Sequence, residues 1–203
     1  YGLILRSSCS EATDEEISED IMAMLSMAET VLADAQGTRP EALTEGDSPH
    51  TLAWREWHGR ATVETEPGGL ENHGVLDQLL QIHDPMVRIG EGTMYVEPTR
   101  ACVAVDVNTG NDMSPSAALK TNLAAARALP RALRLRGWAG QICIDFVSIS
   151  KAHRKQVEQS LRAAFKADPI ETSLVGWTAM GLFEMQRKRE RAPFPIRILE
   201  EIS

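Results

Sequence analysis

The pattern of apolar and polar positions is weak in the first part of the chain and sharp in the second. Apolar residues recur at helical spacing from about residue 14 to residue 35, which predicts an amphipathic helix. Thr13 and Glu16 have the spacing of a capping box at its start, and Gly37 follows its end. The apolar segment 2–7, which precedes this helix, predicts a short strand.

Residues 38–72 show little periodicity and are rich in Gly, Pro, Thr and Glu. We expect one or two short strands in this part of the chain, at 51–54 and 60–65. Residues 72–82 are expected to form a short helix. The first part of the chain is therefore predicted to be small and mixed in structure.

The pattern becomes regular after residue 82 and predicts a sheet with helices. Segments 93–97 and 101–108 alternate like strands and meet at Pro98-Thr99, which predicts a hairpin. The elements expected further along are a helix over 115–136 that is broken or kinked near Pro130, a strand around Asp145, a helix over 151–167, and strands near 172–177 and 181–187. This order predicts an α/β layer with a mixed sheet.

The composition is that of a globular protein, since 43% of the 203 residues are hydrophobic. No run of about 18 apolar residues is present, so we expect no membrane-spanning helix. The three cysteines, Cys9, Cys102 and Cys143, are far apart and odd in number. We expect them to be reduced, buried thiols and not ligands of a structural zinc.

Charge is distributed unevenly along the chain, whose net charge is −8. Residues 1–82 carry 16 acidic and 4 basic side chains, whereas residues 83–203 carry 13 acidic and 17 basic ones. A polyanionic substrate would favour such a basic second part. The same charges are also compatible with basic residues that only solvate helix surfaces.

Two aspartates lie inside strand-like apolar runs, and they are the most informative residues of the sequence. Asp106 lies in 101–110 and Asp145 lies in 141–147. A carboxylate that is buried among apolar residues is costly unless it is compensated. A divalent cation would compensate two converging carboxylates, and Mg²⁺ is held by few carboxylates together with water and phosphates. That arrangement suits phosphodiester cleavage.

Asn108 is expected to lie beside Asp106, because alternate residues of a strand face the same side. The following Thr109-Gly110 turns the chain, which places this pair at a strand end, where sites in open sheets tend to form. The alternative for each aspartate alone is a helix cap or an ion pair with an arginine.

Clusters of basic residues flank the second aspartate and follow the last predicted strand. They are Arg134, Arg136, Lys151, His153, Arg154 and Lys155, and then Arg187, Lys188, Arg189 and Arg191. Arginine forks match phosphate oxygens well. The chain has no histidine spacing typical of a metal site, no Gly-x-Ser-x-Gly elbow and no phosphate-binding glycine loop, which disfavours esterases, NTPases and thiol enzymes.

Several segments resemble the ribonuclease E/G family of bacterial endoribonucleases, in the family's order and nearly its spacing. They are Gly92–Thr99, Ala104–Gly110, Lys120–Ala126, Leu133–Arg136, Gly140–Phe146 and Gly181–Arg189. The resemblance covers about residues 83–191. Its most specific parts are Asp-Val-Asn-Thr-Gly and Ile-Asp-Phe, which are similar to the family's metal-site signatures.

The resemblance implies roles for individual residues. Asp106 and Asp145 match the two Mg²⁺-binding aspartates of the family, and Asn108 matches the asparagine that helps to hold the metal and the attacking water. Arg6 and Ser7 fall where the family reads the 5′-monophosphate of RNA. Basic residues are expected to follow the RNA backbone; these are Lys120, Arg134, Arg136, Arg187 and Arg189.

The resemblance also implies a fold and a function. Residues 83–203 correspond to a mixed-sheet DNase I-like subdomain, and residues 1–82 to a reduced, small α+β region like the 5′-sensor and RNase H-like parts of the family. The implied protein is a Mg²⁺-dependent endoribonuclease that cuts single-stranded RNA in the bacterial cytoplasm. A homodimer is a further expectation.

The sequence departs from the family's pattern in several places, and residues 38–82 are shorter than their counterpart. The OB-type RNA-binding insert and the Cys-Pro-x-Cys zinc link have no counterpart, and Arg100 replaces an acidic residue. An alternative is therefore an RNA-binding or assembly module of the same family with weak or lost catalysis. A structural α/β domain with coincidental carboxylates is the third interpretation.

Overall fold

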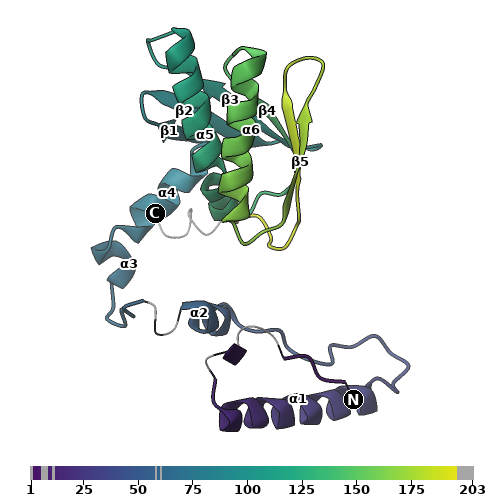
Figure 1. Ribbon diagram of the computed structural model, residues 1–203. Coiled ribbons are helices and arrows are strands. Elements are labelled where there is room, and N and C mark those ends of the chain that lie inside the picture. Colours follow the sequence, from purple (N-terminus) through teal and green to yellow (C-terminus); the bar gives the residue numbers. More distant parts are fainter. Residues whose placement is uncertain (1, 6–8, 11, 58, 60, 196–203) are drawn as a thin grey trace. The chain divides into compact units, whose positions relative to one another are not determined.

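The computed structural model of the chain describes residues 2–5, 9–10, 12–57, 59 and 61–195, and these form two units (Figure 1). The first unit is 1–64 and the second is 65–203. The sequence predicted a boundary between residues 82 and 83. The two divisions differ by the short helices α3 (Gly69–Asn72) and α4 (Val75–His83), which belong to the second unit of the structure.

The first unit contains the helices α1 (Asp14–Asp34) and α2 (Pro49–Trp57). The capping box at the start of α1 is confirmed, because the Thr13 hydroxyl accepts from the backbone of Glu16 and the Glu16 carboxylate accepts in return from the backbone N–H of Thr13. No residue of α1 is buried.

The strands expected in the first unit are not found in its described residues. Residues 2–5 and 61–65 have no regular structure, and the expected strand at 51–54 is part of α2. The Ser48 hydroxyl accepts a hydrogen bond from the backbone N–H of Thr51 at 3.1 Å. This start signal, with Pro49 as the first residue, favours the helix over the strand.

The second unit is mixed α/β and is organised around a six-stranded sheet in the order β1-β2-β3-β4-β6-β5. The strands are β1 (Met86–Ile89), β2 (Gly92–Pro98), β3 (Val103–Asn108), β4 (Gly140–Asp145), β5 (Thr172–Trp177) and β6 (Phe183–Arg187). Strands β3 and β4 are parallel, and all other neighbours are antiparallel. The predicted mixed sheet and its hairpin are confirmed, whereas strand β1 was missed.

Two long helices, α5 (Pro115–Arg136) and α6 (Lys151–Lys166), lie side by side on one face of this sheet (Figure 1). The helix that was expected to be broken or kinked near Pro130 is not broken there, because α5 continues through this residue. Leu129 and Leu133, on either side of the proline, are 1% and 0% exposed. Their packing against the sheet compensates for the backbone hydrogen bond that a proline removes.

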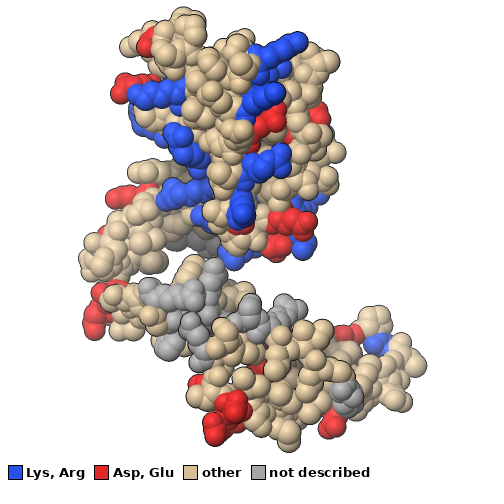
Figure 2. Space-filling model, viewed as in Figure 1, with Lys and Arg blue, Asp and Glu red and all other residues tan. Residues whose placement is uncertain are grey.

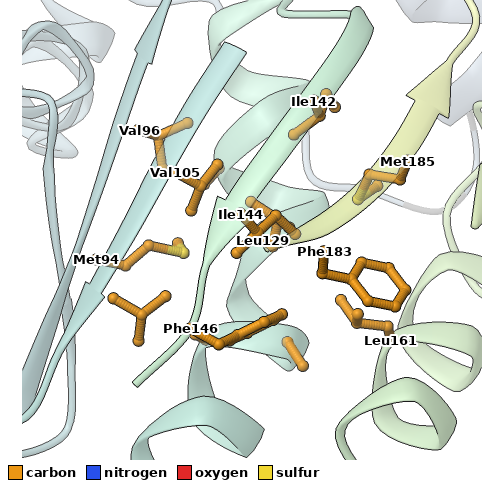
Figure 3. Close-up of a cluster of buried hydrophobic side chains, with 14 of the residues drawn as sticks. Met94, Val96, Val105, Leu129, Ile142, Ile144, Phe146, Leu161, Phe183 and Met185 are labelled. Carbon is orange, nitrogen blue, oxygen red and sulfur yellow. The ribbon is translucent and has the colours of Figure 1, made fainter. Parts of the chain in front are cut away.

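The core of the second unit fills the space between the sheet and the two helices. Figure 3 shows side chains from four strands meeting Leu129 of α5 and Leu161 of α6. The buried strand residues alternate along each strand; among them are Met94, Val96, Val105, Ile142, Ile144, Phe183 and Met185. Each strand therefore turns every second side chain away from the helices, toward the opposite face of the sheet.

Candidate active site

The sheet face opposite α5 and α6 carries the polar side chains of the central strands. In β3, Val103, Val105 and Val107 are buried, whereas Asp106 and Asn108 are exposed. In β4, Ile142 and Ile144 are buried and Asp145 is exposed. The expectation that both aspartates are buried was therefore wrong, because strand alternation turns them outward while their apolar neighbours point into the core.

The structure brings the two aspartates together. Asp106 of β3 and Asp145 of β4 are direct partners in the register of the parallel pair. Neighbouring strands lie about 4.8 Å apart, so the two side chains stand next to each other on the same face. Among the described residues, neither carboxylate forms an ion pair. The pair is thus two adjacent, uncompensated negative charges that are open to solvent.

Asn108 completes this group of three side chains. Its Nδ2 donates a hydrogen bond of 2.6 Å to Oδ2 of Asp106. With the amide nitrogen engaged in this way, the Oδ1 atom of Asn108 remains available to a metal ion or a water molecule. The predicted same-side arrangement of Asn108 and Asp106 is confirmed, and Asp145 joins it from the next strand.

The backbone that follows Asp145 is fixed by a buried asparagine of α5. Asn122 is 0% exposed, and its side chain makes two hydrogen bonds to Val147. Its Nδ2 donates to the carbonyl oxygen of Val147 at 2.8 Å, and its Oδ1 accepts from the Val147 N–H at 3.0 Å. Between Asp145 and Val147, Phe146 is 6% exposed and packs against Trp177. These contacts hold the end of β4 and thereby the position of Asp145.

The strand end at Asn108 is held by the close approach of two turns. A Cβ atom on Gly92 would lie 2.5 Å from the carbonyl oxygen of Asn108, and a Cβ atom on Gly110 would overlap the carbonyl oxygen of Glu91. Only glycine fits at both positions without a shift of the backbone. The Thr109-Gly110 turn therefore rests against the turn between β1 and β2, which fixes the end of β3.

The electrostatic environment of this face is negative. Burial raises the pKa of the Cys143 thiol, and Cys102, Glu184 and Asp145 raise it further. Cys143 lies on β4 two residues before Asp145, and its partner in β6 is Glu184. The carboxylates near Asp145 thus act together on a neighbouring group, and the same field would attract a cation.

The residues present fit Mg²⁺ better than a metal that needs many protein ligands. Among the described residues, no group of three or more His, Cys, Asp or Glu side chains could hold a metal ion. Two adjacent carboxylates and one amide oxygen are an incomplete set, and Mg²⁺ tolerates such a set because it keeps several waters and binds substrate phosphates.

Three of the predicted RNA-backbone residues lie in structural contacts. Arg187 is 1% exposed and donates to Oδ1 of Asp168 at 2.8 Å, and Arg134 pairs with the other oxygen of the same carboxylate. Arg136 is 5% exposed and donates to the Asp84 carbonyl oxygen at 2.7 Å. The guanidinium groups of Arg136 and Arg187 are buried in these contacts, so they are not open to an RNA backbone.

The remaining predicted contacts are exposed or undescribed. Lys120 is exposed on α5 and lines a hollow of about 420 Å³ together with Thr109 and Gly110. Arg189 is exposed, and its guanidinium lies over Gly140 at the start of β4. Arg6 and Ser7, the predicted 5′-phosphate sensors, lie outside the described residues.

Two residues at the site were missed in the sequence. Tyr95 is the partner of Asp106 in β2, so its ring, 36% exposed, continues the row formed by the two aspartates. The alternation of 92–97 indicates this position of Tyr95, because it places Tyr95 on the face opposite the buried Met94. The second missed residue is Asn122, which the sequence marks as a polar residue on the apolar side of a helix.

Comparison with known proteins identifies the family. The family model described as "Ribonuclease E/G family" matches residues 58–190, which is more than half of the chain. The chain therefore belongs to the ribonuclease E/G family.

Individual relatives match parts of the chain. Ribonuclease G of Escherichia coli K12 is 39% identical over 105 residues, which cover 49% of this chain and 22% of the relative. Ribonuclease E of Nostoc sp. PCC 7120 is 28% identical over 230 aligned positions, covering 93% of this chain and 34% of the relative. A chloroplastic ribonuclease E/G-like protein of Arabidopsis thaliana is 33% identical over 119 residues. The chain thus spans only a fifth to a third of these two bacterial enzymes.

Among the described residues, no helix is both long enough and apolar enough to span a lipid bilayer.

Proposed function

We propose that the chain is a Mg²⁺-dependent endoribonuclease that cleaves single-stranded RNA. The observation that carries this proposal is the register of β3 and β4, which pairs Asp106 with Asp145 on an exposed face. Membership of the ribonuclease E/G family supports the reaction type, and the relatives that match are named as ribonucleases.

In this proposal Asp106 and Asp145 would hold the metal ion, which would supply the charge that activates a water molecule and offsets negative charge in the transition state. Asn108 would orient that water through its Oδ1 atom, while its Nδ2 atom keeps the Asp106 carboxylate in place. The end of β4 is held by Asn122, so Asp145 is positioned before substrate arrives.

Single-stranded RNA is the form of substrate that suits this face. On this face Tyr95 presents a ring beside Asp106, on which an unpaired base could stack. Stacking on an exposed ring is the usual means of holding single strands without sequence preference. Bases in a duplex would not be available to this ring.

The test is cleavage of a short fluorescent RNA with a 5′-monophosphate, in Mg²⁺ and in EDTA. Asp106→Asn and Asp145→Asn should each lower the rate by at least about 100-fold, because each removes one of two charged ligands. Glu97→Gln is the matched control, since Glu97 is an exposed carboxylate on the same face, in the neighbouring strand β2. Calorimetric titration with Mg²⁺ measures the metal site independently of cleavage.

The outcomes separate the interpretations. Cleavage by the aspartate variants at the rate of the unmodified chain, or undiminished cleavage in EDTA, would contradict the assignment. RNA binding without cleavage in the unmodified chain would favour a binding or assembly module. Because both aspartates are exposed, the variants should keep the free energy of unfolding within about 0.5 kcal/mol, so a loss of activity would not reflect unfolding.

Recognition of the RNA 5′ end is a further part of the proposal and rests on the resemblance at Arg6 and Ser7. Arg6→Ala should remove any preference for a 5′-monophosphate over a 5′-hydroxyl, while leaving cleavage of the 5′-hydroxyl RNA unchanged. An equal preference in the variant and the unmodified chain would contradict this role. A homodimer is also proposed from the resemblance, and sedimentation analysis tests it.

A further inference from the structure

The outer surface of α5 and α6 is strongly basic, although the chain as a whole is acidic. Helix α5 carries five basic side chains and no acidic one, and α6 carries five basic side chains and only Glu158 as an acidic one. Figure 2 shows these charges spread over the face that the two helices form. We use the name basic helix face for their seven exposed members, Lys120, Arg127, Arg131, Lys151, Lys155, Arg162 and Lys166.

The charges of the basic helix face outnumber the acidic groups beside them, which are Glu158 of α6 and, in the hollow that Lys120 and Arg127 line, Glu91 and Asp112. None of the seven forms an ion pair with another described residue. Several of them are like-charge neighbours one helical turn apart, such as Arg127 with Arg131 and Arg162 with Lys166. Each such pair destabilises a helix by about 0.2–0.5 kcal/mol. A ligand with many negative charges would relieve this repulsion.

We propose that the basic helix face binds a folded, double-helical segment of RNA. A chain of phosphates is the ligand that seven cations along two adjacent helices fit, and the proposal rests on RNA being the substrate. The face lacks the features of a single-strand site. Helix α5 has no aromatic residue; in α6, Phe165 is 6% exposed and buried in the core, and His153 is half-buried. Single strands are held by exposed rings, whereas duplex RNA is bound through its phosphates and shape.

The basic helix face lies apart from the aspartates, so it would hold a part of the RNA that is not cut. It lies on the side of the sheet opposite Asp106 and Asp145, so it cannot hold the phosphate that is cut. Helix α5 begins shortly after Asn108, and α6 begins shortly after Asp145. Both helices therefore start near the carboxyl ends of β3 and β4, the two strands that carry the active-site aspartates. An RNA with a hairpin next to a single-stranded tail could pass over these strand ends and occupy both faces of the sheet.

The test measures binding in a chain that carries Asp106→Asn and Asp145→Asn, so that RNA remains uncut. One probe is a fluorescent hairpin of about 16 base pairs with a single-stranded tail of about ten nucleotides, and the other is the tail alone. Arg127→Ala with Arg131→Ala should weaken binding of the hairpin probe by about tenfold or more. The slope of log K against log salt concentration should also become less steep, by roughly 0.9 for each phosphate contact that is lost. Binding of the tail alone should change less than about twofold.

Two further variants control for charge and folding. Arg39→Ala with Arg100→Ala removes the same charge at exposed positions outside the basic helix face and should leave the affinity for the hairpin unchanged. Arg127→Lys with Arg131→Lys keeps the charges and should retain most of the affinity. Circular dichroism and the thermal midpoint show whether each variant is folded.

The proposal is overturned if the hairpin binds the Arg127→Ala/Arg131→Ala variant as tightly as the parent, or if the control pair weakens binding equally. It is also overturned if vesicles that contain phosphatidylserine bind through these arginines and the hairpin does not. Cleavage of the tail RNA by a chain with intact Asp106 and Asp145 is measured separately. Lost cleavage with retained hairpin binding would overturn only the proposed nuclease function.

Discussion

Replacement of Asn122 by alanine is predicted to weaken both folding and cleavage, although Asn122 lies in the core and on a different element from the aspartates. Its amide is 0% exposed and makes two hydrogen bonds to the backbone of Val147, two residues after Asp145. The alanine variant would lose both bonds and would leave a small cavity beneath the end of β4.

The size of the effect on stability follows from these contacts. Each lost hydrogen bond contributes about 1 kcal/mol net, and a backbone group left without a partner costs more than that. Val147 is only half-buried, so water can reach part of its backbone. We expect the free energy of unfolding to fall by about 2–3 kcal/mol. The effect on cleavage is separate, because a displacement of about 1 Å at a reacting group can lower the rate by about 100-fold.

The assay combines urea unfolding with steady-state cleavage at a temperature where all variants are folded. Leu133→Ala is the control, because Leu133 is also 0% exposed and lies three turns further along α5. That variant should lose about 2–5 kcal/mol of stability and keep its kcat. Asn122→Ala should lower kcat by about 10-fold or more, with a smaller change in KM. An unchanged kcat in the folded Asn122→Ala variant would refute the positioning role.

Three other predictions concern single contacts. Asp168→Ala should lower the free energy of unfolding in urea by about 3–5 kcal/mol, because it leaves the buried guanidinium of Arg187 unpaired. Its control is Glu190→Ala, which removes an exposed ion pair with Lys188 and should cost at most about 1 kcal/mol. Tyr95→Ala should weaken single-stranded RNA binding by about 1–3 kcal/mol and Tyr95→Phe should not; equal losses in both would exclude stacking. The pKa of Cys143 is raised, so its thiolate forms at higher pH in the folded chain than in the unfolded one. Alkylation followed by mass spectrometry should give a higher pH midpoint for Cys143 without urea than with it, and a lower midpoint would contradict this pKa direction.

The second unit could be predicted from the sequence because its signals are local. Alternation in 93–97 and in Ala101–Asn108 predicted the hairpin, and helical spacing predicted α5 and α6. Strand β1 was missed because four residues, Met86–Ile89, are too few to show a period. Short strands were also expected at 2–7 and 51–54. The helix start at Ser48-Pro49 places 51–54 in α2. Residues 2–5, the described part of 2–7, pair with no strand among the described residues.

The candidate site could be predicted in its residues but not in its environment. The identities of Asp106, Asn108 and Asp145 were evident, and period-two geometry placed the first two together. Their burial was misjudged because an apolar run was taken as buried on both faces. In the second unit, α5 and α6 cover one face of this sheet, and the exposed side chains of Asp106 and Asp145 lie on the other. The contacts of Arg136 and Arg187 could not be predicted, because they depend on Asp84 and Asp168, which are distant in the sequence.

The charges of the two faces imply that metal binding and RNA binding are coupled on only one of them. The sheet face opposite α5 and α6 carries four carboxylates, which belong to Asp106, Asp145, Glu97 and Glu184. One basic residue, Arg88 of β1, lies on the same face. Without a cation this face repels phosphates, so the affinity for a single-stranded tail should rise with Mg²⁺ by more than ionic strength explains. The basic helix face needs no metal, so hairpin binding should only weaken as Mg²⁺ competes for phosphates. In a chain with intact Asp106 and Asp145, and with probes whose phosphodiesters resist cleavage, opposite responses of the two probes to Mg²⁺ at constant ionic strength would place them on different faces. Parallel responses would mean that both probes bind the same surface.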